Sequence, residues 1–152
     1  MVVFFNSGMM LHPPRKTLLA CDRAVSAVEF ALVVPLFVML VFGIVVYGSW
    51  LGMMHSVQQL AAEAARTSIA GLTEAERTSL ARAYITGNAG SYPLLTPTKL
   101  TVVAQTSSSD ANVFLVTVTY DATGSLISTL PTFVPAPSPH ISRSAAIPRG
   151  GY

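Results

Sequence analysis

The pattern of hydrophobic residues changes twice along the chain. Its first part is an apolar block within the longest run without a charged residue. From Phe30 to Met54 no residue is charged and most side chains are apolar. A helix of about 20 apolar residues, rising about 1.5 Å each, crosses the ~30 Å hydrocarbon core of a bilayer. A single segment can span lipid only as a helix, because its backbone polar groups must be satisfied internally. The pattern therefore predicts one transmembrane helix over residues 25–54, in contact with membrane lipid.

A helical stripe follows this block. Its apolar residues recur at spacings of three and four, which is typical of a buried helix face; they are Val57, Leu60, Ala61, Ala64 and Ala65. We expect this helix to end near Gly71, because glycine is favoured just past a helix C-terminus. Thr73 and Glu76 have the spacing of a capping box and predict a second helix to about Thr86. Residues 55–86 are thus assigned to an extramembrane helical stem and a second helix, and residues 87–98 to a linker.

From Lys99 onward the period becomes two, as in half-buried strands. Residues 100–106 and 113–120 are rich in β-branched and aromatic side chains, and the polar segment 107–112 between them predicts a turn. One face of the second strand carries Phe114, Val116, Val118 and Tyr120. We expect this apolar face of an antiparallel hairpin to pack against the helical stem.

A weaker alternation over residues 140–147 predicts a third strand that closes a small sheet. Before it, residues 130–139 contain four prolines and must form a loop. Phe133 and Val134 in this loop either pack on the domain or touch the membrane surface or a partner. The predicted fold class is α+β, with a long N-terminal transmembrane helix, a short second helix and a small antiparallel β-sheet in residues 99–152.

Composition agrees with a membrane segment and narrows the chemistry. Charged residues make up 11% of the chain, against about 25% in a typical soluble domain. The net charge of +2 and the absence of a large basic cluster argue against a nucleic-acid partner. His12, His55 and His140 lie far apart, and Cys21 is the single cysteine, so we expect neither a metal site nor a cofactor. The common catalytic motifs are absent as well, so we expect no enzyme activity.

Flanking charge predicts the orientation of the membrane helix. Arg15, Lys16 and Arg23 precede it, and the next basic residue is Arg66. The positive-inside rule therefore places the N-terminus in the cytoplasm and exports the C-terminal domain. Tyr47 and Trp50 lie near the far end of the span, where amphipathic aromatic side chains favour the membrane–water boundary.

Two other N-terminal signals fit the chain less well. A cleavable signal peptide has a shorter apolar region and a small-x-small site, whereas this run is longer, contains Glu29 and ends at Met53-Met54-His55-Ser56. The segment Leu18–Cys21 looks like a lipobox, but its apolar stretch follows the cysteine instead of preceding it. Both signals are disfavoured.

The residues around Glu29 carry a more specific signal. The segment from Arg23 to Phe30 resembles the prepilin peptidase site of type IV pilins, in which a basic leader ends in a small residue and an apolar helix follows. With Val25 as the first mature residue, Glu29 is the fifth and Phe30 the sixth. The sequence AVEFALVVPL and the Ala- and Gln-rich continuation to Arg66 resemble the TadE-like (TadE/TadG) pseudopilins of the tight-adherence Flp pilus system, over residues 22–70.

This resemblance implies a set of roles for named residues. Residues 1–24 would be a leader peptide that a prepilin peptidase removes between Ala24 and Val25. Glu29 would pair with the N-terminal amine of a neighbouring subunit. One departure is that the family usually has glycine before the cut, whereas this chain has Ala24. Gly48 and Gly52 also have the spacing that lets two membrane helices pack closely.

The function implied is that of a minor pseudopilin, an accessory membrane subunit for assembly of an adhesive Flp pilus. It would have a pilin-like stem in the bacterial inner membrane and a periplasmic or extracellular C-terminal domain. Its partners would be prepilin peptidase, other pilin-like subunits and Tad assembly proteins. The alternative is an unprocessed, signal-anchored periplasmic binding or scaffold protein that meets its partner through the hairpin edge.

Overall fold

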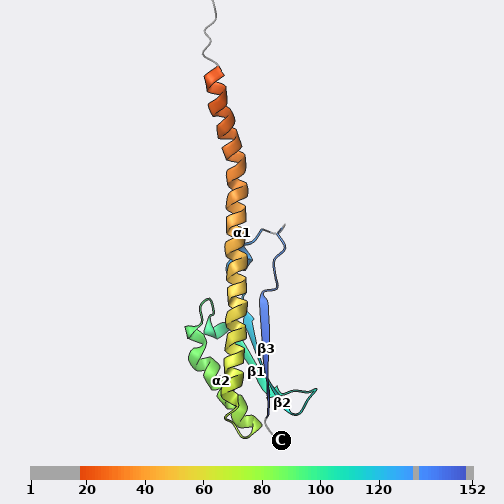
Figure 1. Ribbon diagram of the computed structural model, residues 1–152. Coiled ribbons are helices and arrows are strands. Elements are labelled where there is room, and N and C mark those ends of the chain that lie inside the picture. Colours follow the sequence, from red (N-terminus) through yellow and green to blue (C-terminus); the bar gives the residue numbers. More distant parts are fainter. Residues whose placement is uncertain (1–17, 132–133, 150–152) are drawn as a thin grey trace, which may run out of the picture. The chain divides into compact units, whose positions relative to one another are not determined.

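A computed structural model describes residues 18–131 and 134–149, with side chains from Val25 onward (Figure 1). The chain divides after Phe42 into two compact units, and the second runs from Gly43 to the C-terminus. The predicted leader lies largely outside the described residues, as do His12 and Phe133.

Helix α1 runs from Leu18 to Ser68 and is continuous through Pro35. From Val25 onward it is long and apolar enough to cross a membrane, and no other helix in the described residues has this property. Nearly every side chain from Val25 to Phe42 is exposed. A helix that is hydrophobic all round is typical of a membrane span. The first unit therefore consists of a helix with no core of its own among its described side chains.

In the second unit, α1 buries one stripe of side chains. The stripe has helical spacings of three, four and seven residues and comprises Val46, Met53, Val57, Leu60, Ala61, Ala64 and Ala65. Helix α2 follows from Glu74 to Asn88, with Thr73 as its N-cap and a complete capping box with Glu76. The capping box satisfies backbone N–H groups that the first helical turn leaves unpaired. The sequence prediction of this helix start is confirmed.

Strands β1 (Leu100–Thr106), β2 (Val113–Asp121) and β3 (His140–Pro148) form an antiparallel sheet in the order β1-β2-β3. Alternate residues of β2 are buried and belong to the same core as the α1 stripe; they are Phe114, Val116, Val118 and Tyr120. This is the hairpin face predicted from the sequence to pack on the stem. The predicted third strand also forms and pairs with β2.

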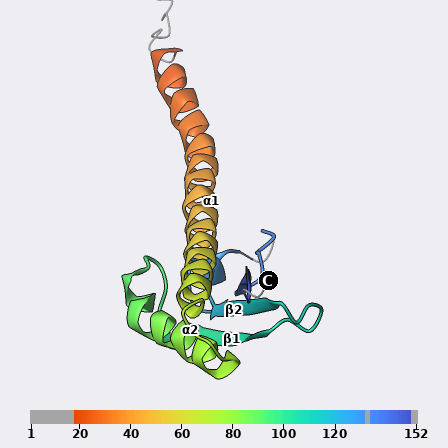
Figure 2. The same cartoon turned by 60° about the horizontal axis from the view of Figure 1, so that its bottom comes forward.

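Helix α2 contacts β1, so that β1 lies between α2 and β2 (Figure 2). The Thr78 hydroxyl donates to the Ala104 carbonyl at 3.0 Å, and the Thr106 hydroxyl donates to Glu74 at 2.6 Å. The hairpin therefore has one edge against a helix and the other paired with β3. The open strand edge of the described sheet belongs to β3.

Short 3-10 helices punctuate the connections, namely η1 (Ala89–Ser91), η2 (Pro97–Lys99) and η3 (Leu126–Thr129). The segment expected to be a linker thus contains two helical turns and buries Ala89 and Leu95 in the core. The observed architecture is α+β, with a long apolar N-terminal helix, a second helix and a three-stranded antiparallel sheet. The predicted fold class is confirmed.

Candidate functional site

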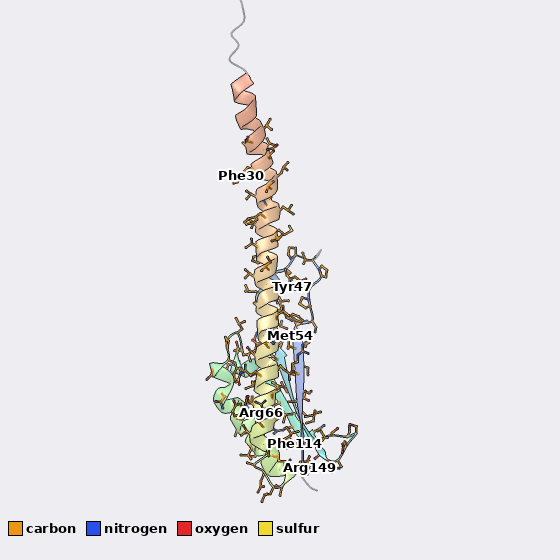
Figure 3. All side chains as sticks on the ribbon, viewed as in Figure 1. Phe30, Tyr47, Met54, Arg66, Phe114 and Arg149 are labelled. Atoms are coloured by element: carbon orange, nitrogen blue, oxygen red, sulfur yellow. The ribbon has the colours of Figure 1, made fainter. Side chains whose placement is uncertain are left out.

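The pilin-like motif lies on the part of α1 that contacts nothing else described. Val25 is 55% exposed and Phe30 is 70% exposed. Glu29 is exposed too, and neither ion pair among the described side chains involves it. Figure 3 shows Phe30 projecting from the helix. The motif residues are thus presented outward on a helix, with nothing from the described chain covering them.

The peptide bond between Ala24 and Val25 lies inside α1, because the helix begins at Leu18. The sequence prediction started the mature helix at Val25, so the helical conformation begins seven residues earlier. Residues 18–24 contain no proline or glycine, so nothing in this segment ends the helix. A peptidase that cuts here would have to open the first turns of α1.

The two glycines of the small-residue spacing have different surroundings. A Cβ added at Gly48 would meet no atom within 4 Å. A Cβ added at Gly52 would lie 3.0 Å from Cδ1 of Leu94. Gly52 is therefore already used within the chain, whereas the space at Gly48 is open.

Tyr47 and Trp50 hold the proline-rich loop. The Tyr47 hydroxyl donates to the Pro135 carbonyl, and the Trp50 indole N–H donates to the Ser138 carbonyl at 3.4 Å. Figure 3 shows Tyr47 beside this loop. Val46, the residue just before this pair, is 1% exposed. The sequence placed these aromatic residues at a membrane boundary, and the structure adds that they bind a loop 88 residues away.

A second loop is held by Ser56, further along α1, and by Tyr120 of β2. The Ser56 hydroxyl donates to the Pro93 carbonyl at 3.3 Å, and the Tyr120 hydroxyl donates to the Leu94 carbonyl at 3.4 Å. Leu94 adopts φ 68°, the left-handed region that a leucine rarely occupies. The loop conformation is thus imposed by its contacts with α1 and β2.

The opposite end of the second unit is closed by a buried arginine. Arg77 is 8% exposed. Its Nε donates to the Gly71 carbonyl at 2.9 Å and its Nη2 donates to the Arg149 carbonyl at 2.9 Å. It therefore ties the turn between the two helices to the end of β3. Sequence reasoning missed this role, because only the fold brings the Arg149 carbonyl, 72 residues away, to Arg77.

The acidic side chains with altered pKa values act as structural acceptors. The backbone N–H groups of Thr73 and Leu72 hold the pKa of Glu76 below its usual value, and the Thr106 hydroxyl and backbone N–H do the same for Glu74. Burial, together with a hydrogen bond involving Tyr84, raises the pKa of Tyr92 to about 12. In the described part of the chain, no group of three His, Cys, Asp or Glu residues is placed to hold a metal ion. These groups support local structure, and none of them converges on a reaction centre.

Comparison of the chain with known families gives a match over the part of α1 that carries the motif and the buried stripe. Residues 24–66 match the family model described as TadE-like protein. The resemblance predicted from the sequence is confirmed over this stretch. Through its TadE-like part the protein is linked to the Tad pilus system in general, and TadE-like proteins are not a known enzyme family. No curated protein and no solved structure matches the chain.

Proposed function

We propose that this TadE-like chain is a minor pseudopilin, an accessory membrane subunit in assembly of an adhesive Flp pilus. In this proposal a prepilin peptidase cuts between Ala24 and Val25. The mature protein then acts by packing its apolar helix with other pilin-like subunits and Tad assembly proteins, without catalysis. The exposed apolar surface of α1 from Val25, with Glu29 and Phe30 near its start, is the observation that carries the proposal.

The apolar surface supports helix packing within a membrane. Except for Val34, which is half-buried, the large apolar side chains from Val25 to Val45 remain 42–71% exposed. In water such a surface would associate non-specifically, whereas in lipid it can contact acyl chains or neighbouring helices. The open space at Gly48 fits close approach by a second helix at the end of this segment.

Glu29 would determine the axial position at which neighbouring subunits pack. A carboxylate within a membrane helix is costly unless it is paired or reaches the interface. Cleavage after Ala24 creates an α-amino group four residues from Glu29, and the amine of one subunit can neutralise the Glu29 of the next. Because an isolated charge is far less favourable in lipid than a pair, this contact would set the axial position of neighbouring subunits.

Flanking charge supports an inner-membrane location with the N-terminus in the cytoplasm and the C-terminal domain exported. Arg15, Lys16 and Arg23 lie before the span. Basic residues are enriched on the cytoplasmic side of membrane helices.

Mass spectrometry of the mature N-terminus in the native host tests processing. We expect the mature chain to begin at Val25. A functional pilus that contains this protein with the bond between Ala24 and Val25 intact would contradict the proposal.

A Glu29→Gln variant tests the mechanism. We expect it to remain in the membrane but to lose pilus assembly or association with its partners. Glu63→Gln is the matched control, because Glu63 lies on the same helix and pairs with Arg66 at 2.7 Å within the chain. Equal assembly by wild type and Glu29→Gln would favour the unprocessed anchor instead.

That alternative, a signal-anchored binding or scaffold protein, would use a different strand from the one expected. Both edges of the predicted hairpin are occupied, by α2 and by β3. A partner that adds a strand to the described sheet would therefore bind β3.

A further inference from the structure

At one end of the second unit, the loops contain no charged residue. This end has two loops, one of residues 89–98 and one whose described residues are 122–131 and 134–139. We call these loops, together with Tyr47 and Trp50, the collar. No residue from 89 to 98 or from 122 to 139 is charged. Both loops contact α1 between Tyr47 and Ser56, as the hydrogen bonds to Pro93, Pro135 and Ser138 show.

Charged groups lie at the edge of the collar, and the Lys99 ammonium reaches it at Thr123. Lys99 donates to the Thr123 carbonyl at 2.6 Å, and His140 lies 3.9 Å from Asp121. On α1 the first charged side chain beyond the collar is Glu63. The described part of the second unit thus has one end whose loop residues are themselves uncharged. Lys99, Asp121 and His140 border these loops.

The collar also exposes large apolar side chains. Leu94 is 56% exposed and Leu126 is 46% exposed, and Leu51, which follows Trp50 on α1, is 49% exposed. A surface of uncharged residues with apolar and aromatic groups fits the headgroup and glycerol region of a bilayer.

Exposure along α1 indicates where the hydrocarbon core ends. Residues 25–45 are 21 residues long, and at about 1.5 Å per residue they match a hydrocarbon core of about 30 Å. Val46 and Met53 are 1% and 3% exposed and belong to the core of the second unit. Side chains already covered by protein do not need lipid.

We propose that the collar lies on the phospholipid surface, and that the lipid-spanning part of α1 ends at Val45 instead of Met54. This inference rests on the membrane anchoring within the proposed function and does not depend on processing or on Glu29. Tyr47 and Trp50 would then place the loops at the interface, with their ring faces toward lipid and their polar atoms on loop carbonyls. The bilayer surface would limit how the exported domain is oriented.

Trp50 is the single tryptophan and can report its own depth. If the span ends at Val45, Trp50 lies about 7.5 Å beyond the hydrocarbon core at about 1.5 Å per residue. In proteoliposomes of the full chain, we expect nitroxide on lipid headgroups to quench Trp50 more strongly than nitroxide at mid-acyl chain. Stronger quenching by the mid-chain label would place Trp50 inside the core and overturn the shorter span.

A fluorescent label on the loop tests the surface contact directly. In a Cys21→Ser background, NBD is attached to Ala136→Cys in the collar or to Ser108→Cys in the exposed turn between β1 and β2. Ser108 is the matched control, because both positions lie on loops outside the sheet. We expect headgroup nitroxide to quench the label at 136, with a blue-shifted emission, and to leave the label at 108 unchanged.

Two results would overturn the collar. A label at 136 that behaves like the label at 108 would show that the loop lies in water. A label at 136 that is shielded from aqueous iodide but not quenched by nitroxide lipid would show that protein, such as a second copy, covers it. Vesicle flotation separates these failures from failure of the anchor. Protein that does not float would remove the membrane span itself, whereas protein that floats with residue 136 in water removes the collar alone.

Discussion

Residues 25–45 and residues 46–68 belong to one helix, yet their side chains meet different surroundings. All large apolar side chains of residues 25–45 except Val34 are exposed, whereas residues 46–68 carry a stripe, from Val46 to Ser68, that the chain itself buries. Both stretches are helical throughout, so local structure does not separate them. The difference lies in whether the remainder of the chain covers the helix.

One helix can thus have one stretch suited to lipid and another suited to a protein core. The free energy falls when an apolar side chain leaves water, whether the side chain enters lipid or a protein core. The first stretch of α1 lacks an intramolecular cover among the described residues, whereas the second stretch has the sheet and α2. Substitutions should therefore affect membrane insertion in the first stretch and domain stability in the second.

The largest expected effect comes from truncating the same residue type in the two stretches. Leu60 is 0% exposed and Leu36 is 69% exposed. Leu60→Ala should lower the free energy of unfolding of the second unit by about 2–5 kcal/mol, because it leaves a cavity in a packed core. Leu36→Ala should leave that free energy unchanged. Denaturant unfolding in detergent, followed by Trp50 fluorescence, measures both, and equal losses would contradict the comparison.

For membrane insertion, in contrast to domain stability, we expect the first stretch of α1 to be the sensitive one. A lysine placed in each stretch tests this. Leu36→Lys places a cation near the middle of the span and should raise the apparent free energy of insertion by about 2.5–3.5 kcal/mol relative to a neutral residue. Gln58→Lys adds the same charge at an exposed position of the second stretch and should not change insertion. Alkaline extraction and glycosylation mapping measure the inserted fraction. Normal insertion of Leu36→Lys would argue that this stretch is not in lipid.

Alanine substitution at two glycines of the second unit should change the free energy of unfolding by smaller amounts and with opposite signs. A Cβ at Gly71 would lie 2.7 Å from the backbone N of Arg77, whereas one at Gly87 would meet no atom within 4 Å. Gly71→Ala should cost about 1–3 kcal/mol, because a backbone atom must move. Gly87→Ala, within α2, should stabilise by up to about 1 kcal/mol through helix propensity. The same unfolding measurement checks both signs, and neither variant should alter membrane insertion.

The smallest effect is a pH dependence of the capping box. Glu76 accepts from the backbone N–H groups of Leu72 at 2.9 Å and Thr73 at 3.1 Å, and these contacts lower its pKa below 4.5. A carboxyl group whose pKa is lower in the folded state stabilises the fold above pH 4.5. This contribution is lost as the pH falls through the lowered pKa. The unfolding midpoint of wild type should therefore fall more than that of Glu76→Gln on acidification below pH 4.5. Parallel pH profiles would show that Glu76 does not contribute.

The sequence by itself determined the elements, because their signals are local. The charge-free run from Phe30 predicted the long helix, Thr73 and Glu76 predicted the start of α2, and the alternation in residues 113–120 predicted the buried face of β2. The Glu29-Phe30 motif led to the TadE-like family, which the match to residues 24–66 confirms.

Only the tertiary structure decided which apolar residues are covered and by what. Val46 and Met53 look the same in sequence as residues that face outward, and their burial depends on strands and loops far along the chain. The bonds from Tyr47 and Trp50 to the proline-rich loop join residues 88 positions apart, and Arg77 reaches the end of β3 across 72 positions. Hydrophobicity and hydrogen-bonding capacity can be predicted from each residue alone, but the partner that satisfies them is set by long-range packing.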